Sequence, residues 1–173
     1  MPSSSRLSLR AAPAALTLCL ALLLSPQVRA VQAEHSFSDV PEDIWYAEAV
    51  AYMWENGLMA GTSATTFSPE ESMTRAMMAV VLYHLAGSPE VTGQDTFDDT
   101  VEGSWYSTAI LWAQQGGYIG GYNAQRFGPD DPLTREQLAV ILWQYAGRPQ
   151  ADSSNTFSDS DGISDWAVQA VDW

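Results

Sequence analysis

The chain has 173 residues, of which 21 are acidic, seven are arginine and none is lysine, so its formal net charge is −14 at pH 7. A chain this acidic repels nucleic acid and anionic lipid, which argues against both classes of partner. The same charge is a solubility feature of many surface proteins.

Residues 1–33 are predicted to be a signal peptide. Two arginines precede an apolar run at residues 11–24, and residues 28–30 or 31–33 supply a small-residue cleavage site. The run is shorter than the about 20 residues of a membrane span, so we expect no membrane insertion after cleavage. The only cysteine, Cys19, lies in this segment, so the exported chain has no disulfide framework. This pattern favours a protein secreted by a bacterium.

The rest of the chain is a repeat of about 60 residues. An ungapped comparison of residues 37–96 with residues 97–156 gives 20 identities in 60 positions. A third copy starts at Phe157 and places Trp166 one residue late, which implies a one-residue insertion. A period of this length and identity indicates an array. We therefore predict repeat 1 at 37–96, repeat 2 at 97–156 and the truncated start of repeat 3 at 157–173.

Each copy predicts a helix, an ordered loop and a second helix. Apolar residues at helical spacing follow a tryptophan in both copies, with Asp43 or Ser104 as the expected N-cap. The second helix is expected to begin after a threonine and to end before Gly87 or Gly147. No segment alternates with a period of two, so the predicted fold class is all-α, built from helix–loop–helix repeats.

The Thr-Arg pair that opens the second helix is the first candidate site. Thr74 and Thr134 are expected to cap the helix, and Thr134 has the spacing of a capping box with Gln137. Capping does not explain the arginines Arg75 and Arg135, which stand where the helix dipole disfavours a cation. Two explanations remain open, which are an ion pair with an acid such as Asp39 or Glu70, and contact with an anionic ligand.

The tryptophans are the second candidate site. Trp45 and Trp105 are each followed by a tyrosine, and they are interpreted either as core anchors, the favoured role, or as platforms for a sugar ring. An exported chain rich in aromatic residues and without lysine favours a glycan partner. Adjacent acids such as Asp130-Asp131 are interpreted as a solvated helix start rather than a catalytic pair. No metal-ligand spacing, nucleotide loop or catalytic triad is present, so we expect no cofactor, no metal and no enzymatic activity.

These motifs resemble the S-layer homology (SLH) domain family. The shared pattern is Phe-x-Asp, a tryptophan and alanine on the first helix, Gly-x-x-x-Gly, Phe-x-Pro, and Thr-Arg at the start of a second helix that ends in glycine. It runs through residues 37–87 and again through residues 97–147. The family's usual Thr-Arg-Ala-Glu is Thr-Arg-Ala-Met in the first copy and Thr-Arg-Glu-Gln in the second.

The resemblance implies a pseudo-threefold array of repeats that binds a pyruvylated secondary cell-wall polysaccharide. The chain would then anchor a host protein non-covalently to the bacterial cell wall, with other surface-layer proteins as further partners. The implied glycan-binding residues are Arg75, Arg135, Thr74, Thr134, Trp45, Trp105, Asp39 and Asp99.

Two other functions remain open from the sequence. The first is a scaffold or accessory region of a secreted envelope enzyme whose catalytic domain lies outside this chain. The second is a helical repeat that binds another surface protein.

Overall fold

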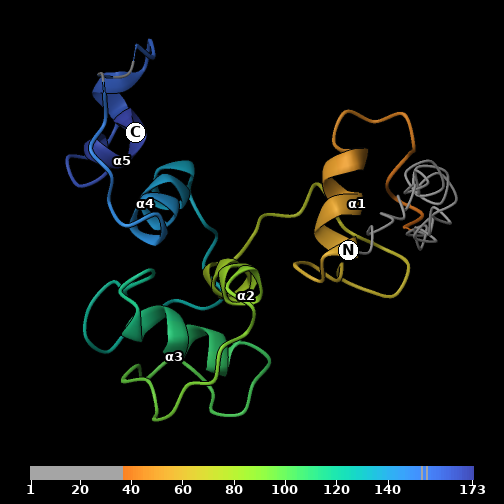
Figure 1. Cartoon of the computed structure of the whole chain (residues 1–173), viewed down its shortest axis with the longest axis horizontal. Helices are drawn as coiled ribbons and strands as arrows, with labels where there is room; N and C mark the ends of the chain where they lie inside the picture. Colours follow the sequence, from red (N-terminus) through yellow and green to blue (C-terminus); the bar gives the residue numbers. More distant parts are fainter. Residues whose placement is uncertain (1–36, 153, 155) are drawn as a thin grey trace, which may run out of the picture. The chain divides into compact units, whose positions relative to one another are not determined.

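The computed structural model describes residues 37–152, 154 and 156–173, which form helices and turns without a strand. The helices are α1 (Ala47–Glu55), α2 (Arg75–Leu85), α3 (Ser107–Gln115), α4 (Arg135–Tyr145) and α5 (Val168–Asp172), with a short 3₁₀ turn at Ser160–Gly162 (Figure 1). The all-α prediction is confirmed for these residues. None of the helices in the described part is long and apolar enough to cross a membrane. The predicted signal peptide, residues 1–33, lies outside the described residues.

The second helix of each repeat begins at the predicted threonine. The hydroxyl oxygen of Thr74 accepts a hydrogen bond from the Met77 amide at 3.2 Å, and that of Thr134 accepts one from the Gln137 amide at 3.2 Å. The side-chain oxygen of Gln137 also accepts a bond from the Thr134 amide at 3.3 Å. The predicted capping box is therefore confirmed in α4, whereas α2 has the threonine cap without the return bond.

The first helix of each repeat begins later than predicted. The N-caps of α1 and α3 are Tyr46 and Tyr106, neither of which makes a side-chain cap bond, so the prediction of Asp43 and Ser104 is wrong. The physical reason is that the preceding residues form successive tight turns instead of a first helical turn. In repeat 1, for example, the Ile44 amide donates back to a carbonyl three residues earlier.

The helices pack across the repeat boundary. Helix α2 of repeat 1 lies against α3 of repeat 2, and α4 lies against α5 (Figure 1). The larger core consequently combines both repeats, with the buried residues Ala76, Met78, Ala79, Leu82, Phe97, Tyr106, Ala109, Ile110, Trp112, Ala113, Ile119, Phe127 and Ile141. A core that neither unit supplies alone is typical of repeat arrays.

A smaller core belongs to repeat 1 alone. Phe37, Val40 and Val50 are buried together, and Trp54 and Phe67 pack against them. The ring centroids of Phe37 and Phe67 lie 5.5 Å apart, so the loop of repeat 1 folds back onto the start of the same repeat. The equivalent rings of repeat 2, those of Phe97 and Phe127, lie 5.3 Å apart.

A glycine in each loop makes room for the phenylalanine ring. A Cβ atom at Gly121 would overlap the ring of Phe97 and would lie 2.6 Å from the carbonyl oxygen of Arg126. A Cβ atom at the adjacent Gly120 would have no heavy atom within 4 Å. The two neighbouring glycines therefore differ sharply in the space around them.

We predict that Gly121→Ala lowers the free energy of unfolding by about 1–3 kcal/mol, because the added methyl group must displace the Phe97 ring or the loop backbone. Gly120→Ala is the matched control, expected to stay within about 0.5 kcal/mol of the wild type. Urea unfolding followed by circular dichroism measures both. Equal effects of the two substitutions would contradict the close approach at Gly121.

Candidate functional site

Arg75 opens α2 in repeat 1 and inserts its side chain into the loop of repeat 2. Its Nε donates a hydrogen bond to the Phe127 carbonyl at 2.9 Å, and its Nη2 donates one to the Gly120 carbonyl at 2.6 Å. The guanidinium carbon lies 4.5 Å from the ring centroid of Tyr122 and 4.8 Å from that of Phe127. Arg75 is only 5% exposed. Its side chain therefore binds the backbone and rings of the next repeat.

Main-chain hydrogen bonds run beside this side chain. The Arg75 amide donates to the Asp131 carbonyl at 3.1 Å, and the Ala76 amide donates to the Pro129 carbonyl at 3.0 Å. These are first-turn amides, which have no partner within their own helix. We call these contacts of Arg75 and Ala76 with residues 120–131 the repeat seam. Carbonyl oxygens of repeat 2 thus bind the helix N-terminus, which the sequence analysis considered as a binding site for an anionic ligand.

The structural role of Arg75 differs from the predicted ion pair. In the described part of the chain it forms no salt bridge with Asp39, Glu70 or any other acid, so that interpretation is wrong. Carbonyl oxygens of repeat 2 take the place of the expected carboxylate. Burial lowers the pKa of Arg75, and nearby Tyr122 and Asp131 oppose that effect. The guanidinium stays protonated, because arginine does not deprotonate in proteins.

Arg135, the equivalent residue on α4, is exposed. Its guanidinium makes no hydrogen bond or salt bridge with the residues that the structure describes. Helix α4 instead contacts the following segment through Glu136, whose carboxylate accepts hydrogen bonds from the Ser164 amide at 3.1 Å and the Ser164 hydroxyl at 3.2 Å. The two arginines predicted as equivalent therefore have different surroundings.

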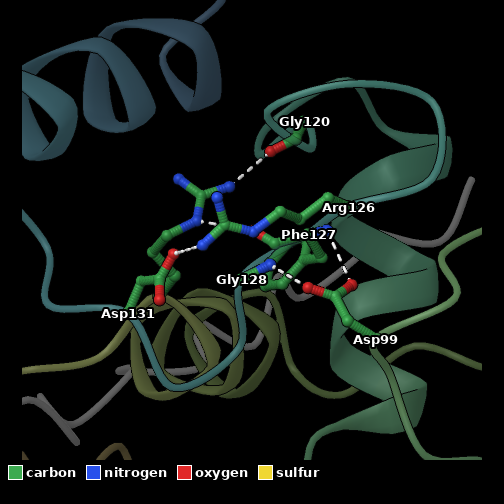
Figure 2. Close-up of polar contacts among 7 residues, drawn as sticks. Asp99, Gly120, Arg126, Phe127, Gly128 and Asp131 are labelled. Carbon is green, nitrogen blue, oxygen red and sulfur yellow. Dashed lines mark hydrogen bonds and ion pairs between the residues drawn. The ribbon is translucent and has the colours of Figure 1, made fainter.

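A second cation lies at the seam. The Nη2 of Arg126 donates to the Asp131 carboxylate at 2.7 Å (Figure 2), and its guanidinium carbon lies 4.9 Å from the centroid of the Tyr122 ring. Sequence reasoning did not single out Arg126 or Tyr122. A comparison of the repeats draws attention to the residues that they share. Arg126 and Tyr122 are not shared, because repeat 1 has threonine at both equivalent positions.

The predicted aspartates hold the loops. Asp39 accepts hydrogen bonds from the amides of Phe67 at 2.9 Å and Ser68 at 2.7 Å. Asp99 accepts bonds from the two equivalent amides of repeat 2, both at 2.8 Å (Figure 2). The bond from the Phe67 amide is the main cause of the lowered pKa of Asp39. Burial alone would raise the pKa of Asp99, but the backbone amide bonds and the nearby charge of Arg126 together outweigh it, and the pKa is lowered.

The predicted tryptophans lie on the surface. Trp45 is 89% exposed and Trp105 is 63% exposed, so the interpretation of these residues as core anchors is wrong. Both precede their helices because the chain turns before the first helical residue. The tyrosines that follow them are the more buried partners, and Tyr106 belongs to the larger core.

A cleft of about 510 Å³ lies between repeat 1 and Trp105. One side is the α2 face that carries Met77, Val80 and His84, and the other is the loop of residues 58–69. The lining is mainly apolar, with hydroxyl groups from Thr62, Ser68 and Ser72. Trp105 is the predicted site residue that the described cleft includes. Within the described residues, no group of three or more His, Cys, Asp and Glu side chains could hold a metal ion.

This geometry defines a helical repeat protein. Hydrogen bonds at the seam join its two repeats, and an exposed aromatic residue stands over a cleft. Comparison with known proteins gives the family. The S-layer homology domain matches residues 36–79 and 96–139, once in each repeat. The chain belongs to the S-layer homology domain family.

Known relatives share this region with the chain. An amylopullulanase from Thermoanaerobacterium thermosulfurigenes is 29% identical over 152 residues, covering 84% of this chain and 8% of that protein. An endoglucanase from Bacillus sp. (strain KSM-635) is 31% identical over 140 residues, covering 78% and 15%. An S-layer protein from Bacillus thuringiensis subsp. finitimus is 30% identical over 111 residues, covering 64% and 13%. The chain thus spans 8–15% of the length of these relatives, and the family supports a role at the cell surface.

We predict that Arg75→Ala lowers the free energy of unfolding by about 2–4 kcal/mol, because two carbonyl groups lose their donors and the side-chain packing is lost. Arg135→Ala removes the same side chain from the equivalent position and should stay within about 0.5 kcal/mol. Arg75→Lys keeps the charge but lacks the planar fork, so it should recover only part of the loss. Thermal unfolding measures all three, and equal effects at Arg75 and Arg135 would contradict the seam.

The lowered pKa values of Asp39 and Asp99 give a pH dependence of stability. A carboxylate whose pKa falls on folding stabilises the fold above its unfolded value of about 4, and this contribution is lost as the pH falls through the folded value. We predict that the melting temperature falls steeply below about pH 4. The double variant Asp39→Asn, Asp99→Asn should melt several degrees lower at pH 7 and show a shallower acid dependence. Parallel melting curves for both proteins would exclude this role.

Proposed function

We propose that the chain anchors an exported bacterial protein to the cell wall by binding a pyruvylated secondary cell-wall polysaccharide without a covalent bond. Family membership supports the cell-surface role. The observation that carries the glycan proposal is the position of Trp105, a tryptophan of repeat 2 that stands exposed over a cleft of repeat 1. An aromatic face beside hydroxyl groups suits a sugar ring, which has an apolar face and a polar edge.

The predicted glycan-binding residues take different roles in this proposal. Trp105 contacts the sugar in the cleft, and the exposed Trp45 offers a second aromatic face in repeat 1. Exposed Arg135, next to Thr134, is free to contact an anionic group on the polymer. Arg75 acts through the seam, because two of its nitrogens are already bonded to carbonyl oxygens. Thr74 supports it by capping the same helix, while Asp39 and Asp99 hold the loops.

We further propose a pseudo-threefold array of helix–loop–helix repeats, with repeat 3 starting at residue 157. Helix α5 packs on α4 as α3 packs on α2, and the residue that precedes each helix, Ala167 or Tyr106, is buried. Helix α4 also carries an exposed arginine at the position that forms the seam in α2. A further loop of the same kind would fit that position. Several sites on one polymer would add avidity to individually weak binding.

The alternative of an accessory region in a secreted envelope enzyme is not favoured. Relatives named as S-layer proteins match the same chain as those named as enzymes. A surface-anchoring role accounts for both groups, because it does not depend on what the rest of the protein does.

We predict that Trp105→Ala weakens binding to purified cell-wall sacculi by about tenfold or more, since a stacking platform is lost, while the helical circular-dichroism signal is unchanged. Tyr52→Ala is the control, because Tyr52 is also an exposed aromatic residue but lies outside the cleft lining. Sedimentation with the sacculi gives the bound fraction. The wild type should lose binding when the polysaccharide is first removed with acid. Binding that persists after removal would refute the glycan proposal.

A further inference from the structure

After the predicted signal peptide, methionine occurs only in repeat 1. Repeat 1 has five methionines, and residues 97–173 have none. At the positions that correspond to Met59, Met73 and Met77, repeat 2 has isoleucine, leucine and glutamine. Both repeats nevertheless share the threonine cap, the aspartate that holds the loop and the phenylalanine contact. The shared construction therefore does not need a sulfur atom at these three positions.

Three of the five methionines line the cleft of about 510 Å³. Met59 follows α1, Met73 lies just before α2, and Met77 lies in the first turn of α2. Each of the three side chains is half-buried, so solvent in the cleft reaches part of it. The other two methionines serve for comparison. Met78 is 4% exposed and belongs to the larger core, whereas Met53 is half-buried outside the cleft lining.

Thioether groups are the only sulfur chemistry that the described residues offer, because the single cysteine, Cys19, lies in the predicted signal peptide. A thioether reacts with a peroxide to give a sulfoxide, and methionine sulfoxide reductases reverse the reaction. A protein at the cell surface lies outside the cytoplasm, where thioredoxin and glutathione keep conditions reducing. The cleft methionines are thus reactive groups, reachable from solvent, in an oxidising environment.

We propose that Met59, Met73 and Met77 are oxidation sites that control binding in the cleft, with hydrogen peroxide as the co-reactant. The sulfur lone pair attacks one oxygen of the peroxide, so that an S–O bond forms and the O–O bond breaks. The hydroxide that leaves takes the proton of the transferred oxygen, and the products are a sulfoxide and water. Sulfur is oxidised by two electrons, which the peroxide gains.

Oxidation makes the lining of the cleft polar. A sulfoxide oxygen is a hydrogen-bond acceptor, and an acceptor placed among apolar side chains without a donor is unfavourable. Neither arginine nor lysine occurs in the described lining, so no such cation is present to bind the new oxygen atoms. The cleft therefore loses the apolar surface that packs on a sugar ring stacked on Trp105. This inference rests on the proposed function and adds a reversible loss of wall binding under oxidising conditions.

The test treats the full chain with dilute hydrogen peroxide and measures its sedimentation with purified sacculi. Oxidation should weaken binding by about tenfold while the helical circular-dichroism signal is unchanged. Treatment with methionine sulfoxide reductases A and B should restore binding. Peptide mass spectrometry locates the added oxygen, which should enter at the three cleft methionines before it enters at Met78.

Repeat 2 supplies the matched variant. Met59→Ile, Met73→Leu and Met77→Gln together place the residues of repeat 2 in the cleft of repeat 1. This triple variant should bind sacculi as the untreated wild type does and should keep that binding after peroxide treatment. Met77→Gln alone is the milder variant, since glutamine at the equivalent position of α4 completes a capping box, and it should remove part of the sensitivity. Met53→Leu is the control and should stay as sensitive as the wild type.

Failure of the inference can be distinguished from failure of the proposed function. Unchanged sacculus binding with oxygen added at all three sites overturns the inference, as does oxygen that enters at Met78 first. A triple variant that loses binding after peroxide treatment as the wild type does overturns it too. In each case, polysaccharide-dependent binding of the untreated wild type still supports the anchor. Failure of the untreated wild type to bind in that way overturns the proposed function, and the inference with it.

Discussion

The Arg75 side chain is the contact on which the two repeats depend. A buried guanidinium is costly unless its donors are bonded, and here the bonds go to two carbonyl oxygens of the neighbouring loop and to the faces of two rings. The packing of α2 against α3 also joins repeat 1 to repeat 2. Because Trp105 immediately precedes Tyr106 and α3, the seam also determines where Trp105 stands relative to α2. The cleft is thus a product of the contact between repeats.

The helices were the most predictable part of the fold, because their signals are local. A threonine cap and a terminal glycine act within one helical turn, and both appear twice in the sequence, so α2 and α4 begin and end as expected. The predicted N-caps of the first helices, Asp43 and Ser104, were wrong. A residue suited to capping does not start a helix when the following residues form tight turns. A sequence repeat shows that two positions are structurally equivalent, but it does not show which backbone conformation they adopt.

The site was less predictable, because its partners are not side chains. The sequence shows that Arg75 is unusual, but the atoms that bind it are main-chain oxygens of Gly120 and Phe127, 45 and 52 residues away. A carbonyl group is present at every residue and has no sequence signature. The exposure of Trp105 was missed for a related reason, since a tryptophan beside a helix is favoured as a core residue unless its neighbours are known to fill that place.

Differences between the repeats bear on function more directly than their similarities. The shared residues explain the shared construction, namely the aspartate that holds the loop, the phenylalanine contact and the threonine cap. The residues that differ, such as Arg126 and Tyr122 in repeat 2, change the charge and shape of one loop while the construction stays the same. A polymer that contacts both repeats would therefore meet two chemically different surfaces on one scaffold. An asymmetric polymer in contact with both repeats would therefore be distinguished by its direction.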